Sequence, residues 1–321
     1  MWKWLAGLVI LAVLAGGAWL LVAGQGKQEA KNRVTVALPP IGGGRAPSLL
    51  LPAPDPALIE NTPDGPLPIT SKDGRQAWQI YARPFDRNDK RPRIALLVTG
   101  LGLDRSLTQA AMDRLPGPVT LAFDPYAASL TDTLQQARNL GHETVLGLPM
   151  EPMDYPRQDP GPLTLLASAS DAQNMARFNK VLASGVGYVG LVAIYGARFT
   201  AEKSAMLPII TSMKERGLML IDNKPPTDNA TALLATQLRL PWIAANRAID
   251  SDTEPATLDQ IFAELEAGAK RDGAAVAIAA LSPALLDRAT LWITSLDGKA
   301  IALAPVSAVA NRQTITAITT P

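Results

Sequence analysis

The chain has 321 residues and a formal net charge of +1, with 30 Lys and Arg against 29 Asp and Glu. This balance leaves no basic footprint for a nucleic-acid partner, and a hydrophobic content of 47% excludes a wholly disordered chain. The sequence contains no cysteine and a single histidine, His142. Disulfides, thiolate nucleophiles and sites that need two imidazoles are therefore excluded.

The amino terminus begins with an apolar segment. Residues 4–23 contain no charged side chain, and as a helix they would span about the 30 Å of a bilayer core. We expect residues 1–24 to form a single-pass anchor in a bacterial inner membrane. The alternatives are a cleaved signal peptide, with Val22-Ala23-Gly24 as an imperfect cleavage site, and a buried core helix.

The segment after the anchor is rich in proline and glycine. Between Gln25 and Pro92 lie 11 of the 27 prolines, together with Gly42-Gly43-Gly44. Such a composition cannot bury a core. We expect residues 25–75 to be a disordered linker that acts as a spacer, with a Pro-rich docking motif as the alternative.

From residue 76 to 305 short apolar runs alternate with amphipathic stretches. Residues 77–85 indicate an edge strand or a cover, because Pro84 would interrupt an interior ladder. The expected strands are 94–98, 119–123, 144–148, 189–194, 218–221, 242–244 and 274–280. The expected helices are 104–115, 131–140, 170–182, 202–216, 227–237, 256–270 and 283–291. Strands that are apolar throughout are covered on both faces, which predicts an α/β fold with a parallel sheet, open or closed into a barrel. Residues 306–321 are expected to be a C-terminal tail.

Ligands in such folds bind at the loops that follow the carboxyl ends of the strands. The polar candidates there for ligand binding are Asp124, Glu151, Tyr195, Arg198, Asp222 and Asp250. The carboxylates could contact a ligand or pair with Arg198 or Lys224, and oxygen-only binding of Ca²⁺ or Mg²⁺ is a lesser alternative. Tyr195 is the best candidate for stacking on a sugar ring.

Six motifs in these elements carry a resemblance to a known family. They read IALLVTGLG (94–102), LPGPVTLAFDPYA (115–127), ARNLGHETVLGLPMEP (137–152), DPGPLTL (159–165), GARFTAE (196–202) and RGLMLID (216–222). In this order the chain resembles the divergent polysaccharide deacetylase family over residues 76–305. The resemblance implies a distorted (β/α) barrel, a role in envelope carbohydrate metabolism, and a divalent metal held by Asp and His. We expect the anchored domain to lie in the periplasm.

The chain departs from the family pattern at the implied metal ligands. The family's Asp pair and three His residues fall on Thr99, Gly100, Gly147, Ile194 and Ala280. None of these residues offers a carboxylate or an imidazole, so we expect the ancestral metal to be lost and no cofactor to be bound. His142 belongs to the opposite end of its strand in the family pattern, where a packing hydrogen bond is its expected role and a lone metal ligand the minor alternative.

Three functional hypotheses remain open. The first is a membrane-anchored, catalytically inactive domain that binds an envelope glycan or a protein partner. The second is an active carbohydrate deacetylase, a hydrolase of C–N bonds, with a relocated site. The third is a structural scaffold.

Overall fold

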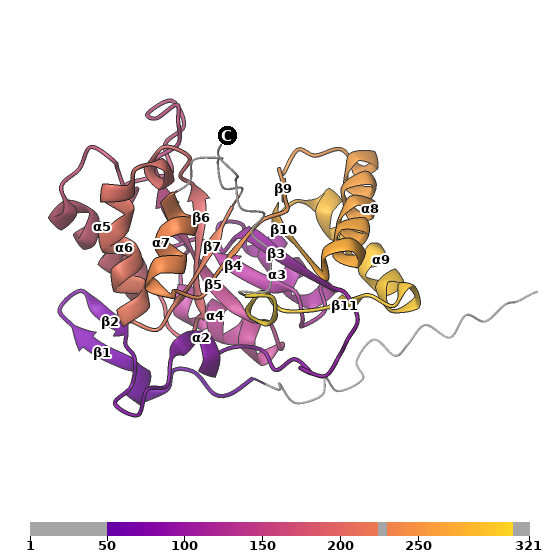
Figure 1. Ribbon diagram of the computed structural model, residues 1–321, viewed down its shortest axis with the longest axis horizontal. Helices are drawn as coiled ribbons and strands as arrows, with labels where there is room; N and C mark the ends of the chain where they lie inside the picture. The colour runs from indigo at the N-terminus through magenta and orange to yellow at the C-terminus, as the bar shows by residue number, and fades with distance from the viewer. Residues whose placement is uncertain (1–49, 224–229, 311–321) are drawn as a thin grey trace, which may run out of the picture. The chain divides into compact units, whose positions relative to one another are not determined.

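The computed structural model describes residues 50–223 and 230–310, which Figure 1 draws in colour. The expected membrane segment 4–23, the first residues of the helix expected at 227–237, Lys224 and residues 311–321 lie outside this part of the chain. Within the described ranges, no helix has the length and apolar character needed to cross a membrane.

A curled sheet of parallel strands forms the centre of the domain (Figure 1). Its strands are β3 (Arg93–Leu101), β4 (Thr120–Phe123), β5 (Thr144–Met150), β6 (Gly190–Tyr195), β7 (Met219–Asp222), β8 (Trp242–Ala244), β9 (Arg247–Ile249), β10 (Ala274–Ala280) and β11 (Ala302–Leu303). They lie in the order β8-β7-β6-β5-β4-β3-β10-β9, and β11 pairs with the start of β3.

The two edge strands of the sheet, β8 and β9, belong to one continuous segment, residues 242–249. On one side Ile243 of β8 pairs with Ile221 of β7, and on the other Ala248 of β9 pairs with Ile278 of β10. Between the two strands the Ala245 N–H donates to the Asp222 carbonyl at 2.9 Å. The expected barrel-type α/β domain is thus confirmed in the form of a curled parallel sheet.

The long helices cover the sheet at the predicted places. They are α3 (Arg105–Arg114), α4 (Leu130–Asn139), α5 (Asp171–Ala183), α6 (Lys203–Glu215), α7 (Ala230–Leu238), α8 (Pro255–Asp272) and α9 (Pro283–Leu296). Helix α5 begins with a capping box, in which Ser170 and Gln173 exchange hydrogen bonds. Residues 94–98 of β3 are fully buried, because the strand is covered on both faces.

The domain begins earlier than the boundary expected at residue 76. Instead of a structureless linker, residues 56–68 form a short 3-10 helix η2 (Pro56–Leu58) and a hairpin of β1 (Ile59–Thr62) and β2 (Gly65–Pro68). Leu58 and Leu67 supply the apolar contacts that order this segment, since both are buried in the core.

The expected edge strand over residues 77–85 is wrong as well. Its first residues form a one-turn helix, α2 (Ala77–Ile80). The Trp78 N–H donates to the Gly217 carbonyl, just after α6. This backbone group is thus satisfied by a turn and not by a neighbouring strand, as it would be in a sheet. The segment is therefore a cover over the sheet end where the strands begin, the amino end.

A buried carboxylate fastens the C-terminal segment to the amino end of the sheet. Glu143, just before β5, is fully buried and accepts hydrogen bonds from Arg83 N, Thr120 Oγ1, Ser307 N and Ser307 Oγ, at 2.5 to 3.2 Å. Ser307 belongs to the short helix η5 (Val306–Ala308), whose Val306 is buried. The tail expected from residue 306 therefore begins inside the packed domain.

We predict that Glu143→Gln lowers the free energy of unfolding by about 2 to 4 kcal/mol. Each carboxylate oxygen accepts one backbone N–H and one hydroxyl, so an amide nitrogen at either position would face two donors. Urea denaturation checks this, with the exposed Glu60→Gln as control.

The pH dependence of stability gives a second readout for the same variant. Burial raises the pKa of Glu143 above its ordinary 4.5, despite the opposing hydrogen bonds. The folded state then holds the proton to higher pH than the unfolded state, so this group makes stability fall as pH rises from 4.5 through the raised pKa. That decline should be absent in Glu143→Gln, and an unchanged pH profile would contradict the assignment.

Candidate functional site

The positions at which the resemblance implies metal ligands lie in two neighbouring pairs near the carboxyl end of the sheet. Thr99 of β3 is in register with Ala280 of β10. The Thr99 hydroxyl donates to the Ala279 carbonyl at 3.4 Å, so its polar atom is engaged in a hydrogen bond to the neighbouring strand β10. Gly100 follows with a φ of +82°, a conformation that glycine adopts without strain.

Gly147 and Ile194 form the second pair, on the adjacent strands β5 and β6. A Cβ atom built on Gly147 would lie 3.1 Å from Cγ1 of Ile194. The isoleucine side chain therefore takes up the space that a side chain at position 147 would need. With Thr99, Gly100 and Ala280 completing the set, the residues present do not fit a divalent metal, which requires carboxylate or imidazole donors.

Within residues 50–223 and 230–310, no cluster of three or more His, Asp or Glu side chains is placed to hold a metal ion.

A sharp turn at the end of β6 shapes the middle of the site. Tyr195 has a φ of +61° and is followed by Gly196 at +89°. A side chain at Gly196 would approach the Cβ of Met150 to 2.8 Å, so only glycine fits there. Tyr195, unlike glycine, has a Cβ atom, so its left-handed backbone is strained by about 1 to 2 kcal/mol. Its side chain is 48% exposed.

This turn brings Arg198 onto Glu151, which is 4% exposed at the end of β5. The Glu151 carbonyl accepts the N–H groups of Arg198 and Phe199 at 3.1 and 3.3 Å. Its carboxylate accepts the Ala167 N–H at 2.6 Å and pairs with Arg198 Nε at 3.3 Å. The carboxylate thus ties three loops together, and the ion pair found for Arg198 is with Glu151.

Asp124 and Tyr126 have a supporting role in the loop after β4. The Asp124 carboxylate accepts the Tyr126 N–H at 2.9 Å, and the Tyr126 hydroxyl accepts the Leu163 N–H at 2.9 Å. A Cβ at Gly161 would lie 2.8 Å from the Tyr126 ring, so one face of the ring rests on the 159–165 motif. Burial raises the pKa of Asp124 and of Tyr126.

The remaining candidates lie at the ends of other strands. Asp222 is 3% exposed at the end of β7, whereas Asp250 follows β9 and is exposed. His142 lies at the amino end, as expected: its ring nitrogens are 3.0 Å from the Val119 carbonyl and 3.2 Å from the Met112 carbonyl. Its expected packing role is therefore confirmed.

The sequence did not predict two structural features of the site, the partners of Glu151 and the strained backbone of Tyr195. The partnership of Glu151 with Ala167 depends on a 16-residue excursion, and no local pattern signals it. The strain at Tyr195 had one signal, the following Gly196, because consecutive left-handed residues often share a tight turn.

We predict that Glu151→Ala lowers the free energy of unfolding by about 2 to 3 kcal/mol, since it leaves the Ala167 N–H and Arg198 without their acceptor. Arg198→Ala should lower it by about 1 kcal/mol or less, because the arginine side chain is half exposed and water screens the pair. Urea denaturation of both variants checks this, and a larger loss in Arg198→Ala would contradict the proposed roles.

Comparison with solved structures identifies two proteins with a similar fold. An uncharacterized protein of Agrobacterium tumefaciens is 33% identical, with a TM-score of 0.74 over 76% of this chain and 99% of that one. A candidate cellobiose-phosphate cleavage protein of Enterococcus faecalis is 10% identical, with a TM-score of 0.50 over 68% of this chain and 99% of that one. The second likeness concerns the fold alone.

Comparison of sequences gives the family. An uncharacterized protein of Haemophilus influenzae is 21% identical over 186 residues, which are 58% of this chain and 65% of that protein, just under two thirds of its length. The sequence profile of the divergent polysaccharide deacetylases matches residues 96–310. With its curled parallel sheet and these matches, the chain belongs to the divergent polysaccharide deacetylase family.

Proposed function

We propose that the protein is a non-catalytic member of this family that binds an envelope glycan at the carboxyl end of its sheet. The observation that carries the proposal is that the Ile194 side chain fills the space that a side chain at position 147 would need. An apolar side chain there fills part of the ancestral centre, and an imidazole at position 147 would collide with it.

The energetics of amide hydrolysis support the loss of catalysis. A bound metal can lower the pKa of water from 15.7 to about 7, a gain of up to roughly 12 kcal/mol in nucleophile activation. A lone carboxylate base contributes only about 3 to 5 kcal/mol. Glu151 is already engaged by Ala167 and Arg198, and Asp124 by the Tyr126 N–H, so neither carboxylate is free to act as that base.

The features that favour binding surround Tyr195. Its half-exposed ring can stack on the apolar face of a sugar, and the half-exposed guanidinium of Arg198 lies three residues further along the turn. Strained backbone is commonly found at ligand sites, where the surrounding structure maintains it. Here the surrounding structure is the set of bonds to Glu151 and the close approach of Gly196 to Met150.

The proposal also assigns a location. Residues 4–23 anchor the chain in the inner membrane as a single pass, and the domain lies in the periplasm, where envelope glycan is present. A protein partner at the same surface is the alternative occupant, and the scaffold hypothesis follows if neither binds.

We predict that Tyr195→Ala weakens binding of chitooligosaccharides or peptidoglycan fragments by about 1 to 3 kcal/mol, the loss expected for one stacking anchor. Tyr195→Phe should bind like the wild type, because it keeps the ring and removes only the hydroxyl. Titration calorimetry measures both, and thermal melts confirm that the variants are folded.

Two results would overturn the proposal. The first is an absence of glycan binding by the wild type at millimolar concentration. The second is one equivalent of tightly held zinc together with deacetylase activity on the same fragments, which would establish a catalytic centre despite Ile194. Equal loss in Tyr195→Phe and Tyr195→Ala would instead assign the contact to the hydroxyl.

We predict that fractionation of a bacterial host leaves the full chain in the inner membrane, because residues 4–23 carry no charge over the length of a bilayer core. Deletion of residues 1–49 should release a periplasmic domain when a cleavable signal is supplied. A soluble wild-type chain that begins near Gln25 would show that the segment is a signal peptide.

A further inference from the structure

A cavity of about 470 Å³ lies at the amino end of the sheet, opposite the site described above. Its volume falls in the range of small-molecule sites. The walls come from α2 and the chain that follows it, from the start of β3, from η5, and from Leu51 near the first described residue. Figure 1 shows α2 and this indigo-to-purple chain along the lower edge of the domain.

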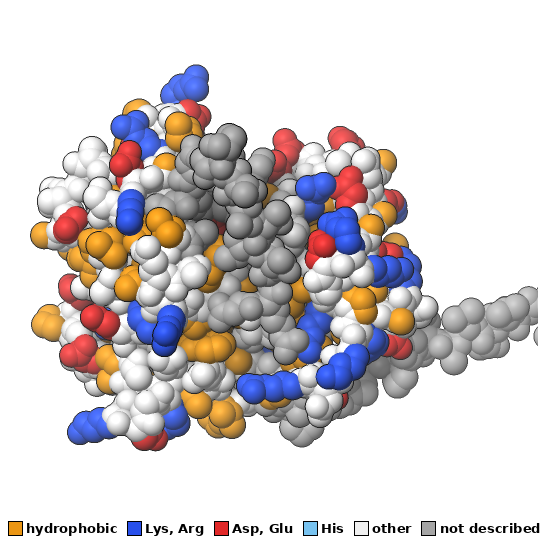
Figure 2. Space-filling model, in the orientation of Figure 1, with side chains coloured by type: hydrophobic (Ala, Val, Ile, Leu, Met, Phe, Trp, Pro, Cys, Tyr) orange, Lys and Arg blue, Asp and Glu red, His pale blue; other side chains and the backbone are white. Residues whose placement is uncertain are grey.

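The charged side chains that line this cavity are all positive. They are Arg83, Arg87 and Arg93, and among residues 50–223 and 230–310 no Asp or Glu lines it. The segment 83–93 that supplies them contains five cations against Asp86 and Asp89. Figure 2 shows Lys and Arg side chains in a row along this lower edge.

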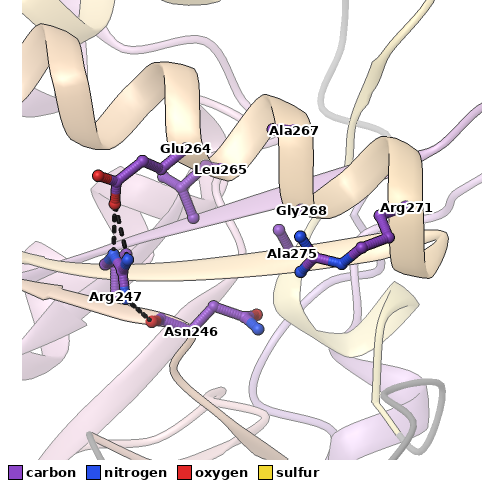
Figure 3. Close-up of a pocket in the computed structure, with 8 residues that line it drawn as sticks. All are labelled: Asn246, Arg247, Glu264, Leu265, Ala267, Gly268, Arg271 and Ala275. Atoms are coloured by element: carbon purple, nitrogen blue, oxygen red, sulfur yellow. Dashed lines mark hydrogen bonds and ion pairs between the residues drawn. The ribbon is translucent and has the colours of Figure 1, made fainter.

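Another cavity, between α8 and the strands β9 and β10, shows the contrast (Figure 3). It has a volume of about 280 Å³ and is also lined by two arginines. Arg247, however, pairs with Glu264 in its own wall at 2.7 Å, and Arg271 pairs with Asp272 at 2.7 Å. Both of its arginines thus pair with a nearby carboxylate, whereas the described residues that line the larger cavity include three arginines and no carboxylate.

Backbone groups hold two of the three arginines in place. Arg93 stacks over the Phe85 ring at 4.5 Å and donates to the Ala308 carbonyl at 3.0 Å. Arg83 donates to the Gly141 carbonyl at 2.5 Å, and a Cβ at Gly117 would lie 2.8 Å from its Nη1. The Arg83 guanidinium thus occupies a space that is open because Gly117 has no side chain. These contacts preorganise both groups before any ligand arrives.

The negative groups near the cavity are already engaged. Glu143, behind Ser307, accepts four hydrogen bonds, and Asp89 pairs with Arg91 at 2.7 Å. Asp86 accepts the N–H of Asn88. Burial lowers the pKa of Arg83, and the field of Glu143 only partly opposes this, so an anionic ligand would stabilise the half-buried charge further.

We propose that this cavity binds a phosphate ester, with the phosphate on the arginines and the ester's carbon skeleton against Trp78 and Phe85. Guanidinium groups bind phosphate with paired, charge-assisted hydrogen bonds. A phosphate presents oxygens in several directions and can meet arginines from separate walls, whereas a carboxylate presents two oxygens in one plane. The partly apolar walls match the organic part of an ester.

Two sources can supply this chemistry, a phospholipid headgroup or a soluble phosphate ester. The lipid source rests on the membrane anchor of the proposed function. Leu51 lines the cavity and is tied to Arg138, whose Nη2 donates to the Leu51 carbonyl at 2.7 Å. In the sequence, Leu51 follows Ala23, the last residue of that anchor, by 28 positions.

The test uses the purified full chain in a neutral detergent and compares sn-glycerol 3-phosphate with glycerol, which differ only in the phosphate. Calorimetry should detect binding of the ester alone. Arg87→Gln and Arg83→Gln should each weaken it about tenfold or more. Arg105→Gln, which removes an exposed arginine at the start of α3, should bind like the wild type.

A second arm identifies the source. In nanodiscs that contain phosphatidylglycerol, an occupying headgroup should weaken the apparent affinity for glycerol 3-phosphate relative to detergent. An unchanged affinity assigns the site to a soluble ester.

The proposal is overturned if glycerol 3-phosphate binds no better than glycerol, or if both arginine variants bind as tightly as the wild type. Should Arg83→Gln fail to fold, Arg87→Gln decides, because Arg87 is exposed and substitutions of exposed side chains usually change stability little. Tyr195→Ala should bind the ester normally, so this test and that of the glycan site succeed or fail independently.

Discussion

The double pairing of residues 242–249 is the constraint on which the domain's organisation depends. Because β8 completes one edge of the sheet and β9 the other, one short segment joins the two edges of the curled sheet. All its strands are parallel, so their carboxyl ends lie on one side, and the curl brings the loops with the family motifs together there. The amino ends lie on the opposite side, where the segments before β3 and after β11 cover them. The curled parallel sheet therefore gives the protein two separate surfaces with different chemistry.

The residues at the implied metal positions pack against one another on neighbouring strands. Ile194 and Gly147 are complementary in volume, and a well-packed interior does not accept a larger side chain at one position without movement at the other. Thr99 and Ala280 are similarly adjacent on β3 and β10. The two strand pairs thus hold side chains that suit each other and suit no metal. A metal centre at these positions would require coordinated substitutions on four strands, β3, β5, β6 and β10.

Sequence patterns predicted the regular part of this structure well. Fully apolar strands such as 94–98 and capped helices such as α5 carry strong local signals, and their positions agree with the structure to within a few residues. The hairpin at 59–68 was missed because its prolines indicate a linker, whereas the burial of Leu58 and Leu67 depends on distant partners. The cavity of Arg83 and Arg93 could not be predicted either, since its walls come from both ends of the domain. Long-range contacts of this kind leave no periodic trace in the sequence.

The bonds between Glu143 and Ser307 have a consequence for the synthesis of the protein. They join residues 164 positions apart, and the bond from Val306 N to Thr120 Oγ1 spans 186 positions. Until residue 307 has left the ribosome, Glu143 lacks both Ser307 donors, which are half of the hydrogen bonds that it accepts in the folded domain. Non-local contacts of this kind slow folding, and the amino side of the sheet can be sealed only after residue 307 is available.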